Sequence, residues 1–150
     1  MARGSASADC GEETARPEEA HTVHATVQGL EPDRWYWYRF VALGEASPVG
    51  RTRTFPLPTV VAPRLRFALA SCQDWQAGLF SAWHDIGLQD LDCVVHVGDY
   101  IYEGGINRNA IRQNNSGELF TLADYRNRYA LYKTDPWLQQ AHALFPFLVT

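Results

Sequence analysis

The sequence predicts an α/β fold preceded by part of an antiparallel β-sandwich. Residues 21–55 contain three short segments rich in β-branched and aromatic residues, separated by turns that contain glycine or proline. From residue 65 onward, short apolar segments alternate with segments whose apolar residues recur at helical spacing. This second arrangement is typical of parallel strands joined by right-handed crossovers.

The β part is expected to contain strands over 21–27, 35–42 and 51–55. The spacing G-L-x-P-x-x-x-Y-x-Y-R-F over residues 29–40 is similar to the last strands of a fibronectin type III-like domain. In such domains a tyrosine packs on the preceding loop, and a complete sandwich needs about seven strands. We therefore expect residues 21–56 to be a partial fibronectin-like domain whose first strands lie outside this sequence.

A stiff, proline-containing linker is expected over 57–64, and six elements follow it. They are a strand over 65–71, a helix over 75–88, a strand over 92–97, a helix over 121–132, a helix from 136, and a strand over 145–150. A loop rich in asparagine and glycine separates the second strand from the second helix.

Two of these helices carry more detailed predictions. Asp135 is expected to cap the third helix, with Pro136 at its first position. The second helix is expected to face inward through four apolar positions. These are Leu122, Tyr125, Tyr129 and Leu131.

Composition and charge exclude several classes of function. The net charge is −4 with acidic and basic residues interspersed, so we expect no specificity for nucleic acid. No apolar run approaches the roughly 18 residues of a membrane span. Residues 1–20 are polar, are expected to be a disordered lead-in, and lack the apolar segment of a signal peptide. The cysteines Cys10, Cys72 and Cys93 form neither a C-x-x-C motif nor an even-numbered disulfide set.

Three candidate metal ligands follow the ends of neighbouring strands. Cys72 comes directly after the strand over 65–71, Asp99 follows the strand over 92–97, and Tyr102 lies three residues later. In open parallel sheets, ligands bind beyond the carboxyl ends of the strands. A thiolate and a phenolate favour a strongly acidic ion such as ferric iron, and a carboxylate can bridge to a harder ion. The pattern therefore predicts a metal pair that activates phosphoesters.

Each of these residues also has an ordinary structural interpretation. Cys72 can be a small buried hydrophobe, Asp99 a turn former and Tyr102 a packing residue. His96, in the strand before Asp99, is interpreted as a core histidine with satisfied hydrogen bonds rather than as a ligand. The aromatic residues over 35–38 are interpreted as sandwich core, not as a base-stacking platform.

The joint pattern resembles the alkaline phosphatase D (PhoD-like) family of phosphatases and phosphodiesterases. The motifs that carry this resemblance are F-A-L-A-S-C-Q over 67–73, H-V-G-D-Y-I-Y-E over 96–103, and L-A-D-Y-R-N-R-Y-A-L-Y over 122–132. The D-P pair at 135–136 and the F-P pair at 145–146 also match, and the resemblance covers roughly residues 20–150.

The resemblance implies a metallophosphoesterase α/β sandwich over 65–150 and an iron and calcium centre. Cys72, Asp99 and Tyr102 match the first ligands of that family, with Asp99 as the bridging carboxylate and Tyr102 as the phenolate. The family continues with a W-D-D-H-E stretch and with later Asn, Asp and His ligands. None of these is found up to Thr150, so we expect this piece to be inactive alone.

The same resemblance implies substrates and location. Members of this family act on phosphate monoesters and diesters, including cell-wall polymers of the teichoic-acid type in some members. They are usually exported to the periplasm or secreted.

The sequence is also consistent with two other functions. Purple acid phosphatases share a fibronectin-like front domain and a G-D-x-x-Y stretch, but they carry an aspartate where this sequence has Cys72. A non-enzymatic binding module built from the β part is the alternative outside the enzymes, because fibronectin-like domains often perform no chemistry.

Overall fold

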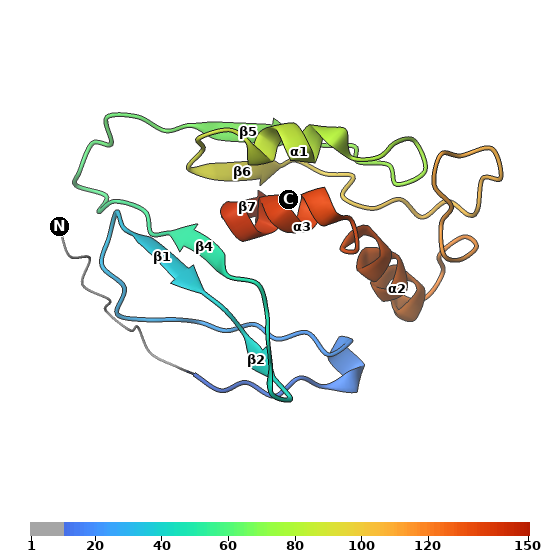
Figure 1. The fold of residues 1–150 in the computed structure, drawn as a ribbon, viewed down its shortest axis with the longest axis horizontal. Coiled ribbons are helices and arrows are strands. Elements are labelled where there is room, and N and C mark those ends of the chain that lie inside the picture. The colour runs from blue at the N-terminus through green and yellow to red at the C-terminus, as the bar shows by residue number, and fades with distance from the viewer. Residues whose placement is uncertain (1–10) are drawn as a thin grey trace.

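The computed structural model describes residues 11–150, which form a β part and an α/β part (Figure 1). The α/β part is built on a parallel sheet of three strands, with the second strand in the middle. These strands are β5 (Phe67–Ala70), β6 (Cys93–His96) and β7 (Phe147–Val149). The predicted parallel order is confirmed, and each strand lies inside its predicted range.

Three helices accompany the sheet, namely α1 (Ser81–Gly87), α2 (Leu122–Tyr132) and α3 (Pro136–Leu144). Helices α1 and α3 pack against each other and against one face of the sheet (Figure 1). Trp83 from α1, Val94 from β6 and Leu138 from α3 meet in the buried core. None of the helices that the structure describes is long and apolar enough to cross a membrane.

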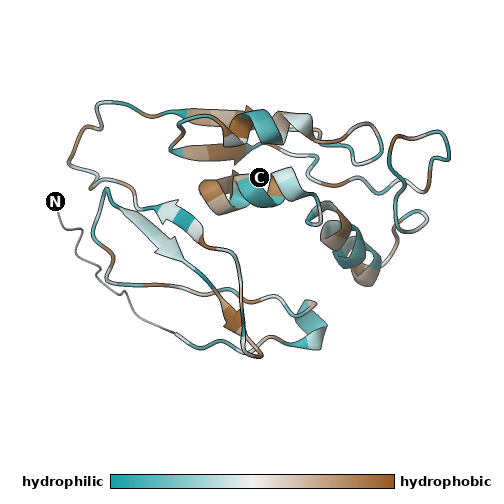
Figure 2. Cartoon of the chain, in the orientation of Figure 1, coloured by the Kyte–Doolittle hydropathy of each residue, from teal (hydrophilic) through white to brown (hydrophobic). Residues whose placement is uncertain are grey.

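The opposite face of the sheet carries apolar side chains that the described residues leave open. Leu69 of β5 and Leu148 of β7 both stand beside Val95 in register, and Leu69 is 64% exposed. Strands β5 and β6 are largely brown in the hydropathy view (Figure 2), as expected for parallel strands that are usually buried on both faces.

Helix starts follow from local chemistry. The carboxylate of Asp135 accepts hydrogen bonds from the N–H groups of Trp137 and Leu138, both at 3.0 Å, and Pro136 opens α3. This confirms the predicted cap. Helix α2 begins with a reciprocal capping box between Thr121 and Asp124, which satisfies N–H groups that the first helical turn leaves free.

The predicted helix over 75–88 starts later than expected, at Ser81. Residues 74–77 form turns instead, with the N–H of Gln76 bonded to the Asp74 carboxylate. The N–H of Trp75 donates to the Tyr132 hydroxyl at 3.1 Å. These tertiary contacts outweigh the helical pattern in this segment.

The predicted inward face of α2 is right at Leu131, which packs against the core, and wrong at its other three positions. Leu122, Tyr125 and Tyr129 are exposed, while Arg128 and Tyr132 are completely buried and Leu131 is half-buried. The reason is that α2 packs on a polar loop, residues 103–117, whose backbone carbonyls need hydrogen-bond donors.

The β part differs from its prediction in three ways: the expected strand over 35–42 is divided in two, a short strand lies in the segment expected to be a turn, and the expected strand over 21–27 is missing. Strand β1 (Trp35–Tyr38) pairs antiparallel with β4 (Gly50–Arg53), and β2 (Val41–Ala42) pairs with β3 (Glu45–Ala46). The predicted strand over 21–27 is not formed, and within residues 11–150 no strand pairs with this segment.

Aromatic residues of the β part are also less buried than expected. Trp37 is 61% exposed, and Tyr38 and Phe40 are exposed as well. The hydroxyl of Tyr36 accepts a hydrogen bond of 2.7 Å from the N–H of Glu31, which is the expected contact of a tyrosine with the preceding loop.

The expected lead-in over 1–20 falls partly on residues 1–10, including Cys10, which lie outside the described residues. Its remaining part contains a short 3-10 helix, η1 (Pro17–Glu19).

Two arginines of β4 attach the β part to the α/β part. Arg51 donates to the carbonyl of Leu144 at 2.6 Å, and its guanidinium lies 4.4 Å from the Trp35 ring centroid. Arg53 forms ion pairs with Asp33 and with Asp92, which precedes β6.

Candidate metal centre

The ends of β5 and β6 place Cys72 and Asp99 at one edge of the sheet. Ala70 and His96 are partners in the register, so the chains that leave these two strands run side by side. The N–H of Cys72 donates to the Gly98 carbonyl at 3.3 Å, and the N–H of Gln73 donates to the Asp99 carbonyl at 3.2 Å. These two hydrogen bonds fix the position of the loop after β5 relative to the loop after β6.

The three sequence-predicted residues come together around one carboxylate oxygen. The Cys72 thiol lies 3.5 Å from Oδ2 of Asp99, and the Tyr102 hydroxyl donates to the same Oδ2 at 3.0 Å. Cys72 and Asp99 are exposed and Tyr102 is half-buried, so the cluster opens to the surface. The ordinary interpretation of Cys72 as a buried hydrophobe is therefore wrong.

Unusual backbone conformations occur at both loop residues. Cys72 has a φ of +57° and Asp99 a φ of +52°, in the left-handed region that non-glycine residues seldom adopt. Gly98, with a φ of +114°, adopts a conformation that a side chain would disfavour. Such strained conformations cluster at functional sites, where the surrounding structure fixes them.

The electrostatics of the cluster favour a cation. Desolvation, followed by the hydrogen bonds to Asp99 and Cys72 and their charges, raises the pKa of Tyr102. A metal ion reverses this effect, because its charge stabilises the deprotonated forms of its ligands. Within residues 11–150 no set of three His, Cys, Asp or Glu side chains could hold a metal, and the third side chain of this cluster is a tyrosine.

Gln73 connects the two loops to α1, and this role was not predicted from the sequence. Its side chain is buried, donates to the Tyr100 carbonyl at 2.9 Å and accepts from the Trp83 indole N–H at 2.8 Å. It thereby ties both loops to α1. A polar residue directly after a candidate ligand is the only sequence signal that could have identified it.

His96 lies in the core but is not satisfied. It is completely buried between Trp83 and Tyr100, and neither ring nitrogen has a hydrogen-bond partner among the described residues. Desolvation lowers the pKa of His96, although the Asp99 charge opposes this effect. The prediction of a core histidine is right about its position and wrong about its hydrogen bonds.

A second polar cluster supports Tyr100, the residue after Asp99. Nε2 of His142 lies 2.7 Å from the Tyr100 hydroxyl and 2.8 Å from Nζ of Lys133. Burial, followed by the charges of Lys133 and His96, lowers the pKa of His142 to about 3. Burial also lowers the pKa of Lys133 to about 8. A neutral His142 thus links α3 to Tyr100 of the Asp99 loop and to Lys133 at the end of α2.

Family comparisons match both parts of the chain. The family model described as PhoD-like phosphatase matches residues 67–150, and the one described as PhoD-like phosphatase, N-terminal domain, matches residues 2–56. The matches adjoin the segment over 57–66, which contains the expected linker.

Individual relatives agree with these matches. Alkaline phosphatase D from Bacillus subtilis (strain 168) is 47% identical over 145 residues, which covers 93% of this chain and 25% of that protein. A solved structure described as "Structure of PhoD" superposes with a TM-score of 0.90 at 47% identity, covering 93% of this chain and 28% of that one. The chain therefore spans about a quarter of the length of these relatives.

Proposed function

Because the chain belongs to the PhoD-like phosphatase family, we propose that its metal centre serves the hydrolysis of phosphoesters. The proposal concerns the complete protein, meaning the product of the whole reading frame that contains these residues. The observation that carries it is the convergence of the Cys72 thiol and the Tyr102 hydroxyl on Oδ2 of Asp99.

The donor set is compatible with the iron and calcium that the family resemblance implies. Cys72, Tyr102 and Asp99 would hold these ions, because thiolate and phenolate groups suit ferric iron and a carboxylate suits calcium. When bound, these ions supply the positive charge that polarises a phosphoryl group toward attack. The exposed position of Cys72 and Asp99 supports the entry of a substrate to this edge of the sheet.

The residues of this chain contribute position and charge. Asp99 stands between the other two donors because the left-handed turn after β6 aims its carboxylate back toward Cys72. Gln73 and the paired loop backbones restrict movement of the two ligands. Preorganised ligands of this kind lower the cost of assembling the charged transition state.

We expect residues 1–150 alone to be inactive. The described residues supply one thiol, one carboxylate and one phenol to the centre, and a pair of ions needs more ligands than these. The further ligands would come from the W-D-D-H-E stretch and the later Asn, Asp and His residues typical of the family.

We also propose the domains, the substrates and the location of the complete protein. Residues 21–56 would belong to a fibronectin-like N-terminal domain and residues 65–150 to a metallophosphoesterase sandwich. The substrates would be phosphate monoesters and diesters, either small molecules or cell-wall polymers. The complete protein would be exported to the periplasm or secreted.

An activity assay on the complete protein tests this function. We expect hydrolysis of p-nitrophenyl phosphate or its bis ester, loss of activity on removal of metal with a chelator, and recovery with iron and calcium. Cys72→Ser should reduce iron retention and activity together. A protein that folds without metal and cleaves neither ester would instead support a non-enzymatic binding module.

A further inference from the structure

Arg128, on the inner face of α2, is completely buried, and its hydrogen bonds within residues 11–150 go to Tyr102 and to the loop that follows it. One terminal nitrogen, Nη1, donates to the carbonyls of Tyr102 at 2.7 Å and Gly104 at 2.9 Å. The other, Nη2, donates to the carbonyls of Ser116 at 3.3 Å and Gly117 at 3.0 Å, and to the Ser116 hydroxyl at 3.2 Å. The guanidinium thus joins both ends of the loop.

Burial of the Arg128 charge costs free energy, and this cost is hard to explain if the residue serves only to pack α2. A buried charge without a carboxylate partner is expensive, and arginine does not shed its proton in proteins. Among the described residues no acidic side chain is paired with Arg128, and its Nε has no partner. An apolar residue would fill the same space without this desolvation cost, so the hydrogen bonds to the loop must serve a specific arrangement of that loop.

Of the three candidate metal ligands, Tyr102 most needs a contact that fixes its backbone. Cys72 and Asp99 follow strands directly, and paired backbone hydrogen bonds hold their loops. Tyr102 lies outside every helix and strand, at the start of the loop over 103–117. Its carbonyl accepts from Arg128, while its hydroxyl reaches Oδ2 of Asp99 at 3.0 Å.

We propose that Arg128 is a positioning residue of the metal centre, which fixes the main chain at Tyr102 so that the phenol oxygen stays within bonding distance of the ion beside Asp99. This inference rests on the proposed role of Tyr102 as a ligand. It adds a residue outside the ligand set, namely an arginine on α2 whose guanidinium holds the backbone of the loop.

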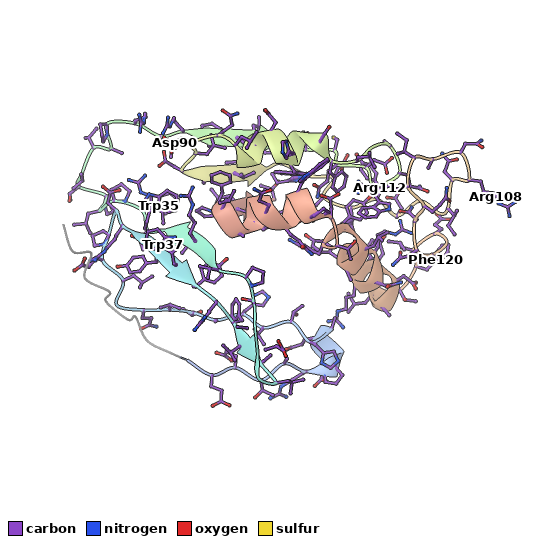
Figure 3. All side chains as sticks on the ribbon, viewed as in Figure 1. Trp35, Trp37, Asp90, Arg108, Arg112 and Phe120 are labelled. Carbon is purple, nitrogen blue, oxygen red and sulfur yellow. The ribbon has the colours of Figure 1, made fainter. Side chains whose placement is uncertain are left out.

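The test compares variants of the complete protein. Arg128→Met keeps an unbranched but shorter apolar side chain and removes every donor, whereas Arg128→Lys keeps the charge but cannot hold both ends of the loop with one ammonium. Arg108→Met is the matched control, because Arg108 lies exposed at the outer end of the same loop (Figure 3) and no hydrogen bond of its side chain is found within residues 11–150. Tyr102→Phe reports on the ligand itself.

Two readouts separate positioning from folding. The first is iron affinity, with the intensity and position of the visible tyrosinate-to-iron charge-transfer band per bound iron. The second is hydrogen exchange of residues 103–117 in metal-free protein. Loss of residues that orient metal ligands typically costs 10–100-fold in affinity. We expect a loss of iron affinity of about 10-fold or more in Arg128→Met, a smaller loss in Arg128→Lys, and none in Arg108→Met.

The outcomes are distinguishable. If the unaltered protein lacks the band, or Tyr102→Phe keeps it, the ligand role of Tyr102 is wrong. If Tyr102→Phe loses the band while Arg128→Lys keeps the affinity, the band and the loop exchange of the unaltered protein, the positioning role is overturned. Arg128→Lys decides the question if Arg128→Met does not fold. A lower melting temperature with an unchanged band per iron would mark Arg128 as purely structural and would also overturn the inference.

Discussion

The hydroxyl of Tyr102 donates to Oδ2 of Asp99 at 3.0 Å across a turn of only three residues, with Asp99 in a left-handed backbone conformation. Without a cation, this contact is a hydrogen bond that keeps the phenol protonated, since it contributes to the raised pKa of Tyr102. In the proposed metal centre, the same short separation would let both oxygens serve as ligands of one cation. The folded chain thus holds the donors in place before any ion arrives.

Metal binding should stabilise the complete protein. A ligand present at 100 times its dissociation constant adds about 2.7 kcal/mol to the free energy of unfolding. We therefore expect a chelator to lower the melting temperature of the unaltered protein, and iron with calcium to restore it. Cys72→Ser should respond far less to iron. Equal shifts in both proteins would show that Cys72 is not a ligand.

Asp92 should make stability depend on pH. The N–H of Arg66, followed by the charge of Arg53, lowers the pKa of Asp92 against the opposing effect of burial. The unfolded carboxyl titrates near 3.9, so its contribution is complete above that pH and is lost as the pH falls further.

Asp92→Asn should therefore reduce the free energy of unfolding by about 1–2 kcal/mol at pH 7. The difference from the unaltered protein should shrink below about pH 4, as measured by urea unfolding. Asp90→Asn is the matched control, because Asp90 pairs with Arg66 on the surface with its side chain 79% exposed. Such pairs contribute about 0–1 kcal/mol. A constant difference at every pH would contradict the role given to Asp92.

His142 should make the protein sensitive to mild acid. Its pKa is lowered to about 3, so the folded protein keeps it neutral while the unfolded chain protonates it below about 6.5. Stability should thus fall as the pH drops from about 6.5 toward 3. His142→Gln retains an acceptor for Tyr100 and does not titrate.

Between pH 7 and 4.5, the unaltered protein should lose roughly 2 kcal/mol more than His142→Gln in urea unfolding. His84→Gln, at an exposed position of α1, should behave like the unaltered protein. An identical acid response in His142→Gln would show that His142 is already accessible to protons in the folded state.

The core between α3 and the sheet should dominate stability. Leu138 is completely buried, so Leu138→Ala should lower the free energy of unfolding by about 2–5 kcal/mol. Leu79 is 56% exposed, and Leu79→Ala should change the free energy of unfolding by less than about 0.5 kcal/mol. Chemical denaturation of both variants provides the measurement, and similar losses in the two would contradict the assigned core.

The sequence predicts the parts of the fold that depend on local chemistry. The three parallel strands are short apolar segments with clear ends, and Asp135 with Pro136 is a strong helix start. The positions of Cys72 and Asp99 at one edge follow from the parallel order alone, because both residues come directly after strand ends.

Features that depend on distant partners were not predictable. The alternation over 21–27 resembles a strand, but a strand forms only where a neighbour accepts its hydrogen bonds. The inward face of α2 is set by Arg128, whose partners are loop carbonyls that leave no hydrophobic pattern. In the same way, nothing near His96 in the sequence shows that its ring is buried without a hydrogen bond.

Iron K-edge X-ray absorption of the complete protein tests the metal centre most directly. We expect one sulfur atom in the first coordination shell of the iron, supplied by Cys72, and a shell of only nitrogen and oxygen in Cys72→Ser. Iron bound without sulfur in the unaltered protein, or a sulfur signal that persists in Cys72→Ser, would contradict this expectation.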